Sequence, residues 1–131
     1  MEIDLHNLPE SQVYGYLINA YRLRVDDDGK FTSTIRQNSL YSDNPQPIRD
    51  FRQFLDSAEY RKGLLPSWWS NAKRAECKRL AQRGGWHTLN GAVEKSDIQE
   101  HYGDNMIPME LRLIAERVYG KPVTMFRRRT R

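Results

Sequence analysis

Apolar residues recur at helical spacing in the first part of the chain. The first is Tyr14, which comes after Pro9. It is followed at i+3, i+4, i+7 and i+11 by Leu17, Ile18, Tyr21 and Val25. This spacing predicts a helix that turns one face toward a core. The acidic run at 26–28 is expected to lie beyond the end of this helix, because carboxylates oppose the negative end of the helix dipole.

Two further stretches have the same periodicity. A helix at 48–62 is predicted to end before Gly63, a residue type that suits the position after a helix. Its buried face consists of Ile48, Phe51, Phe54, Leu55 and Ala58. A last helix is predicted to begin near Pro108 and to end before Gly120. Its buried face consists of Leu111, Ile114, Ala115 and Val118.

A third helix is predicted from its possible capping residues and carries two tryptophans at its entrance. Ser67 or Ser70 suits its N-cap, and it is expected to run to about Gln82, before two glycines. Adjacent residues of a helix diverge by about 100°, so Trp68 and Trp69 are not expected to share one face. One ring would enter the core, and the other would be available to anchor a partner. The alternative is that both belong to the core or its edge.

A short fourth helix is predicted where Ser96 and Gln99 match a capping box. It would run from Asp97 to Tyr102 and be closed by Gly103. Within it, Asp97 and His101 are four residues apart and would lie on one face. A carboxylate beside an imidazole can orient a general base. However, the sequence places no nucleophile next to them, and the simpler interpretation is a surface pair.

The remaining segments lack periodicity. Residues 30–47 are polar and contain two prolines, which predicts an irregular, mobile loop with one short extended piece at 31–35. Residues 86–93 are interpreted as a single helical turn. The whole pattern predicts an all-α fold, an irregular compact bundle of five or six helices with little or no sheet. We expect one domain at 1–122 and a basic tail at 123–131.

Composition sharpens this picture of the core. The chain has 131 residues, a length that suits a single domain. Only 38% of its residues are hydrophobic, but 11% are aromatic. Because aromatic side chains bury large areas, we expect a small core that is rich in aromatic rather than aliphatic residues.

Positive charge is concentrated in the C-terminal tail, and a second basic stretch lies at 73–79. The net charge is +4, and the last five residues contain four arginines, so the rest of the chain is close to neutral. This tail is either a solvated end, a phosphate contact or part of a nuclear address. An RNA-associating domain is one alternative function, although no array of exposed aromatic residues accompanies the basic ones. Its candidate residues are Lys73, Arg74, Lys78, Arg79, Arg127, Arg128 and Arg129.

Cysteine and histidine usage argues against metal chemistry. Cys77 is the only cysteine, which excludes an intramolecular disulfide and suits a reducing compartment. The three histidines form no close pair of ligands with it, so no zinc site and no cofactor are expected. No signal-peptide pattern or membrane-length apolar run occurs in the sequence. We therefore expect an intracellular protein, cytoplasmic or nuclear.

Several stretches together resemble a helical region found in fungal proteins that also carry a MYND-type zinc finger. The resemblance covers about residues 10–122 and is carried by YRLRV at 21–25, FLD at 54–56, GLLPSWW at 63–69, KRAEC at 73–77, VEKSDIQEHYG at 93–103 and MIPMELR at 106–112. MYND fingers bind short proline-containing peptides. This chain lacks the cysteines and the histidine of the finger, so the resemblance implies only the accompanying helical domain and transfers no ligand or peptide-binding residue.

The sequence favours a protein-interaction or adaptor module without catalytic activity and without membrane contact. Its partner would be a peptide or another protein, bound in a groove near the tryptophan pair; the oligomeric state stays open. The candidate binding residues are Trp68, Trp69, Asp97, His101 and Tyr102. An enzyme that uses Asp97 and His101 is the second alternative to this function.

Overall fold

The structure is a computed structural model that describes residues 3–123. It contains the five α-helices α1 (Glu10–Asp27), α2 (Pro47–Tyr60), α3 (Asn71–Gln82), α4 (Lys95–Tyr102) and α5 (Ile107–Tyr119). No strand occurs within the described range. The predicted all-α fold is therefore confirmed.

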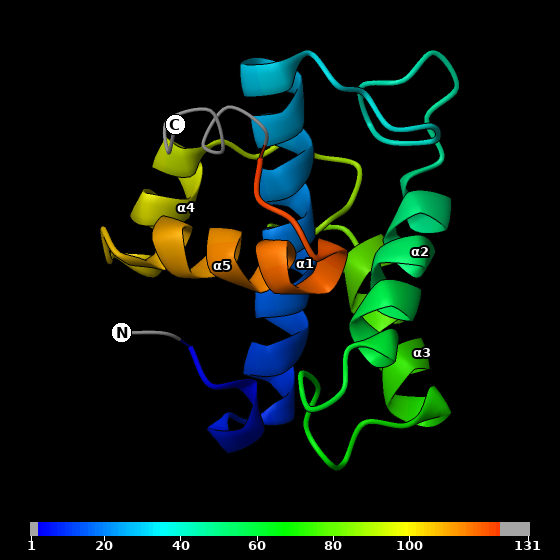
Figure 1. The fold of residues 1–131 in the computed structure, drawn as a ribbon, viewed down its shortest axis with the longest axis vertical. Helices are drawn as coiled ribbons and strands as arrows, with labels where there is room; N and C mark the ends of the chain where they lie inside the picture. The colour runs from blue at the N-terminus through cyan, green and yellow to red at the C-terminus, as the bar shows by residue number, and fades with distance from the viewer. Residues whose placement is uncertain (1–2, 124–131) are drawn as a thin grey trace.

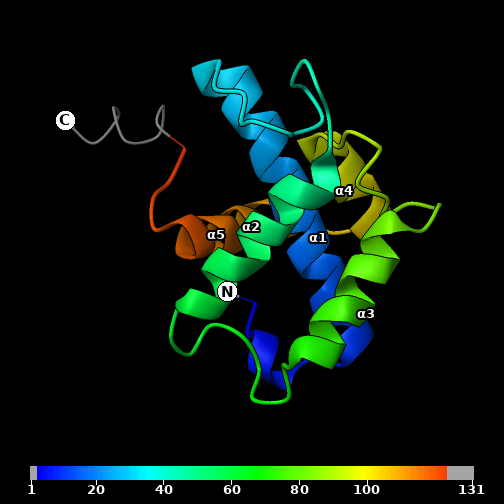
Figure 2. The ribbon, with the colours of Figure 1, turned by 90° about the vertical axis from the view of Figure 1, so that its right-hand side faces the viewer.

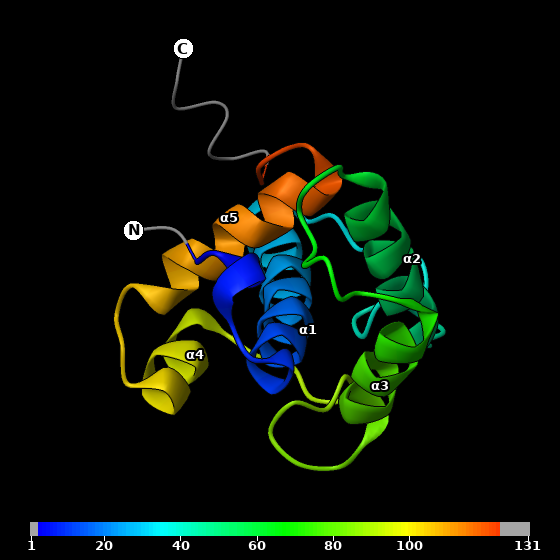
Figure 3. The same cartoon turned by 90° about the horizontal axis from the view of Figure 1, so that it is seen from below.

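Helix α1 forms the centre of the molecule, and the other helices surround it (Figure 1). Helix α5 crosses α1, whereas α2 and α3 lie to one side of it and α4 to the other (Figure 1, Figure 3). A quarter turn shows α2 and α3 side by side, both running across the direction of α1 (Figure 2). Because neighbours cover α1 from several directions, Tyr16 is the only residue between Val13 and Asp27 that is not buried.

The acidic run lies inside the helical segment, so the prediction that the helix ends before it is wrong. Helix α1 continues to Asp27 and leads into one π-helical turn at Asp28–Thr32. Arg112 of α5 forms a bidentate pair with Asp27 at 2.8 and 2.9 Å, and Arg24 donates to Asp28 at 3.0 Å. These cations neutralise the carboxylates, which removes the penalty from the helix dipole.

The other helices begin and end near the predicted positions. The hydroxyl of Ser70 accepts the N–H of Lys73 at 3.3 Å, which confirms Ser70 as the N-cap of α3. Gly103 and Gly120 end α4 and α5 with φ of 63° and 78°, a left-handed conformation that glycine adopts without a steric penalty. These local signals needed no tertiary information.

Three local predictions are wrong. Helix α4 is capped by Glu94 rather than by Ser96, since the N–H of Glu94 bonds the carboxylate of Asp97 at 2.9 Å. Residues 86–93 form turns and irregular backbone instead of a helical turn. The expected extended piece at 31–35 is also absent, because the π-helical turn occupies its first residues.

The core contains an aromatic cluster within a larger aliphatic interior. Phe51 and Phe54 of α2 stack with their centroids 5.9 Å apart, and the ring of Tyr21 meets both edge-on. The ring of Tyr119 contacts Phe54 from α5 at 5.5 Å. Aliphatic side chains fill the rest of the interior, so the expectation of a core that is aromatic rather than aliphatic is only half right. The largest of these are Leu17, Ile18, Leu23, Leu55, Ile98 and Leu111.

Among the described helices, none combines the length and the apolar character that crossing a bilayer requires.

Candidate functional site

An open cleft of about 320 Å³ lies between the first half of α1 and the end of α4. Three parts of the chain line it: α1, the segment between α3 and α4, and α4 itself. The lining residues are Ser11, Gln12, Gly15, Tyr16, His87, His101 and Tyr102. Two of them, His101 and Tyr102, are predicted binding residues, and the other five were not predicted.

Gly15 allows the other walls of the cleft to approach α1 closely. A Cβ atom at this position would lie 3.2 Å from Cε1 of His87 and 3.8 Å from the hydroxyl of Tyr102. The first distance is tighter than ordinary van der Waals contact, so a larger residue would displace the imidazole. A glycine in the middle of a helix costs about 0.5–1 kcal/mol relative to alanine, and here the close approach accounts for it.

Five rings pack together around the cleft, and we call them the ring cluster: Tyr16, Trp86, His87, His101 and Tyr102. The imidazole of His101 lies parallel to the indole of Trp86, with centroids 3.6 Å apart and an angle of 7°. His87 meets His101 edge-on at 5.7 Å, and Tyr16 contacts Tyr102 at 5.5 Å. Stacking on Trp86 fixes the orientation of the exposed imidazole of His101.

A polar network behind the cleft holds the ring cluster in place. Asn19, which is fully buried, donates to the hydroxyl of Tyr102 at 2.8 Å and lies 3.2 Å from Nδ1 of His87. Its amide oxygen accepts from Arg22 at 2.9 Å. Because an amide nitrogen only donates, Nδ1 of His87 accepts, and the proton of the neutral ring is on Nε2.

The side chains of the cleft are neutral at physiological pH. Burial is the main cause that lowers the pKa of both His87 and His101, and the charge of Arg22 lowers both further. Burial also raises the pKa of Tyr102 to about 12. The pKa of Tyr16 is raised by burial first and then by the nearby carboxylates of Glu110 and Asp104.

The tryptophan pair lies elsewhere, over Tyr14, and does not line the cleft. Trp68 and Trp69 precede α3 instead of belonging to it, so the expected divergence of their side chains does not apply. Both rings meet the ring of Tyr14 edge-on, at 6.1 and 6.2 Å. Both are half-buried, and the indole N–H of Trp69 donates to Glu59 at 2.8 Å. These contacts match the alternative that both rings belong to the edge of the core.

The expected pair of Asp97 and His101 is not formed. The carboxylate of Asp97 caps α4, and the imidazole of His101 stacks on Trp86. Within the described residues, no hydrogen bond or ion pair joins the two side chains, nor does any bond join Ser11 to an imidazole of the cleft. Cys77 is fully buried, and burial raises its pKa to about 12, which leaves little thiolate for nucleophilic chemistry.

The predicted basic surface of α3 is partly neutralised. Lys73 pairs with Glu10 at 3.1 Å, and Arg74 pairs with Asp56 at 2.8 Å. Lys78 and Arg79 complete this set in α3. The three tail arginines, Arg127, Arg128 and Arg129, lie outside the described residues. In the part of the chain that the structure describes, no group of three or more His, Cys, Asp or Glu side chains is placed to hold a metal ion.

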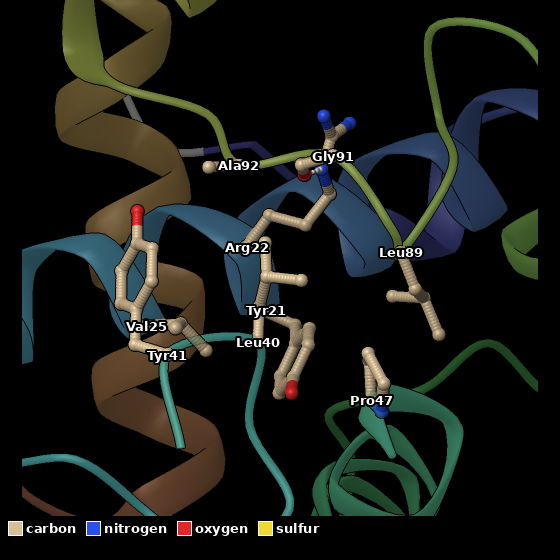
Figure 4. A pocket seen from close by; sticks show the side chains of 9 residues that line it. All are labelled: Tyr21, Arg22, Val25, Leu40, Tyr41, Pro47, Leu89, Gly91 and Ala92. Carbon is tan, nitrogen blue, oxygen red and sulfur yellow. Dashed lines mark hydrogen bonds between the residues drawn. The ribbon is translucent and has the colours of Figure 1, made fainter. Parts of the chain in front are cut away.

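A second hollow lies where α1 meets the loop before α2 and the segment before α4. Figure 4 shows side chains from these three parts, such as Tyr21, Tyr41 and Leu89, around it. Its volume is only about 10 Å³, which is about the minimum for a single water molecule. This hollow is therefore a packing gap and offers no room for a ligand.

No known protein family matches the chain, and no curated protein or solved structure was found to be similar to it. The resemblance to the helical region of fungal MYND-type proteins stays a prediction.

Proposed function

We propose that this domain is a protein-interaction module without catalytic activity, and that the cleft between α1 and α4 captures a basic side chain of a partner peptide. The observation that carries the proposal is an open cleft that is walled by neutral rings and lacks a positively charged lining residue. The proposed binding surface is this cleft, which includes His101 and Tyr102. The tryptophan pair, which was also predicted to bind the partner, is not part of it.

The size of the cleft suits one or two side chains of a peptide. Sites for small ligands enclose about 300–1,000 Å³, and this cleft of about 320 Å³ is at the lower limit. Its walls belong to two helices and a segment that rests on a buried amide, Asn19. A preorganised site of this kind loses little conformational entropy when a ligand enters.

The charges favour a cationic side chain over an anionic one. None of the lining residues carries a positive charge at neutral pH, because both imidazoles are neutral. Asp104 and Glu110 are close enough to raise the pKa of Tyr16. The nearest buried cation, Arg22, donates to the carbonyl oxygens of Trp86 and Gly91 instead of facing a ligand.

The rings add a second reason for a cation. Lysine and arginine side chains are attracted to the faces of aromatic rings, by about 0.5–1 kcal/mol at exposed sites. Tyr16 and Tyr102 are both half-buried and tilted by 38° to each other, so part of each ring stays accessible. An arginine would in addition donate to the tyrosine hydroxyls or to the acceptor nitrogen of neutral His101.

The proposal is tested by titrating the domain, labelled with ¹⁵N, with three capped Gly–Ser peptides that contain one arginine, one lysine or one glutamate. We expect amide shifts around Gly15 and Tyr102 with the basic peptides only. Tyr16→Ala should weaken these shifts, whereas Tyr60→Ala should not, because Tyr60 is 82% exposed and lies on α2. Equal binding of the glutamate peptide, or an unchanged affinity of Tyr16→Ala, would show that the assignment is wrong.

A further inference from the structure

Another cavity, of about 210 Å³, lies at the other end of α1, beside the π-helical turn and the end of α5. This volume is well above the roughly 10–15 Å³ that a single water molecule needs. Polar and charged side chains form most of its wall. They include Arg24, Thr32, Thr34, Arg36, Tyr119 and Lys121.

Positive charge predominates in this wall. Arg24, Arg36 and Lys121 face a single lining carboxylate, Asp28. Asp28 pairs with both arginines, and Arg36 also lies 3.4 Å from the buried carboxylate of Asp50. Counting both carboxylates still leaves one positive charge in excess. Lys121 is exposed and forms no ion pair with a described residue.

Two hydrogen-bond donors of the wall lack an acceptor. Nη2 of Arg36 and the hydroxyl of Tyr119 are buried, and neither forms a hydrogen bond with a described residue. Two guanidinium groups lie over the ring of Tyr119, that of Arg24 at 5.0 Å and that of Arg36 at 4.8 Å from its centroid. Buried donors are nearly always paired in native proteins, so two unpaired donors in one cationic wall indicate a missing acceptor.

We propose that this cavity binds a phosphate group, either as inorganic phosphate or as a phosphate monoester. Its oxygens would accept from Nη2 of Arg36 and from the hydroxyl of Tyr119, and Lys121 would supply the balancing charge. Arginine suits this role because its planar donors match the geometry of phosphate oxygens. Both unpaired donors are shielded from solvent, so a phosphate reaches them only after a side chain of the wall moves. Thr34 and Lys121 are exposed members of this wall. This site is independent of the cleft between α1 and α4.

The test is thermal unfolding of the whole chain in sodium phosphate, in O-phosphoserine and in sodium chloride of equal ionic strength. We expect phosphate to raise Tm beyond the chloride value, with a saturating dose dependence. Stabilisation by O-phosphoserine as well would identify a monoester as the ligand, and stabilisation by phosphate alone would identify the inorganic ion. A Tm that depends only on ionic strength would overturn the proposal.

Two variants separate a specific site from general attraction to positive charge. Tyr119→Phe removes only an unpaired hydroxyl, so the fold and the Tm without phosphate should be kept, while the apparent Kd for phosphate rises roughly fivefold. Lys121→Gln should raise it by a similar factor. Lys62→Gln is the matched control, because Lys62 is an exposed lysine outside this wall. A phosphate affinity that is the same in all three variants as in the wild type would contradict the site.

Discussion

The bond between Arg112 and Asp27 offers the sharpest test of how this fold is held together. The carboxylate of Asp27 is 1% exposed and the side chain of Arg112 is 20% exposed, and two hydrogen bonds of 2.8 and 2.9 Å join them. In Arg112→Met the hydrophobic stem is largely kept, but the buried carboxylate loses its partner. Breaking a buried ion pair costs about 3–5 kcal/mol. Because water reaches one side of Arg112, we expect about 2–4 kcal/mol here.

Urea unfolding followed by far-ultraviolet circular dichroism measures this loss directly. A destabilisation of 2–4 kcal/mol corresponds to a fall in Tm of roughly 8–16 °C for a chain of this size. Arg117→Met is the matched control, since Arg117 lies on the same helix and is exposed; it should change the stability by less than about 0.5 kcal/mol. Adding Asp27→Asn to Arg112→Met should restore part of the loss. If the two methionine variants are equally stable, the pair does not hold α5 on α1.

Three further predictions concern the cleft and the helix caps. The pKa of both cleft imidazoles is lowered in the folded chain, so near pH 6 the unfolded chain binds more protons than the folded chain does. Stability should therefore fall as the pH drops below about 6.5. The urea midpoint of His101→Asn should fall less steeply than that of the wild type over the same range. Gly15→Val should displace the adjacent imidazole, destabilise the fold by about 1–3 kcal/mol and abolish peptide shifts, whereas Gly84→Ala, with no atom within 4 Å of the new Cβ, should keep them. Ser70→Ala should cost about 0.5–2 kcal/mol in urea unfolding because it removes a cap, and Ser96→Ala should be nearly neutral; equal effects would contradict the assignment of caps.

The fold was predictable wherever a local signal decides the structure. Ser70 caps a helix through its own hydroxyl, and Gly120 ends one through its own backbone, so neither depends on distant residues. The acidic run was predicted wrongly because its partner Arg112 lies 85 residues away in the chain. A helix rule based on the dipole alone has no information about such a cation.

The candidate site was predictable only in part, for the same reason. His101 is a candidate because it lies four residues after Asp97 in a recognisable short helix, and Tyr102 because it belongs to the segment that carries the family resemblance. Trp86 and His87 come from a segment without periodicity. They join the ring cluster only because Arg22 binds the carbonyl oxygen of Trp86 across 64 positions and Asn19 binds His87 across 68 positions of the chain. A glycine between two tyrosines, Gly15, was the one available signal, since a helix interior disfavours glycine unless something must approach closely.

The burial of α1 on nearly every side has a consequence for synthesis on the ribosome. The carboxylate of Asp27 at the end of this helix is made 85 residues before Arg112, the arginine that binds it. At about 5–20 residues per second, the nascent chain waits roughly 4–17 s for that partner, with apolar surface exposed. In the finished domain the charged residues of α1 form buried pairs. During this interval water solvates them instead, and their charge opposes aggregation of the nascent chain. Chains with Asp27→Leu should therefore aggregate during translation more than Arg112→Met chains do, because they lose this solvation from the start.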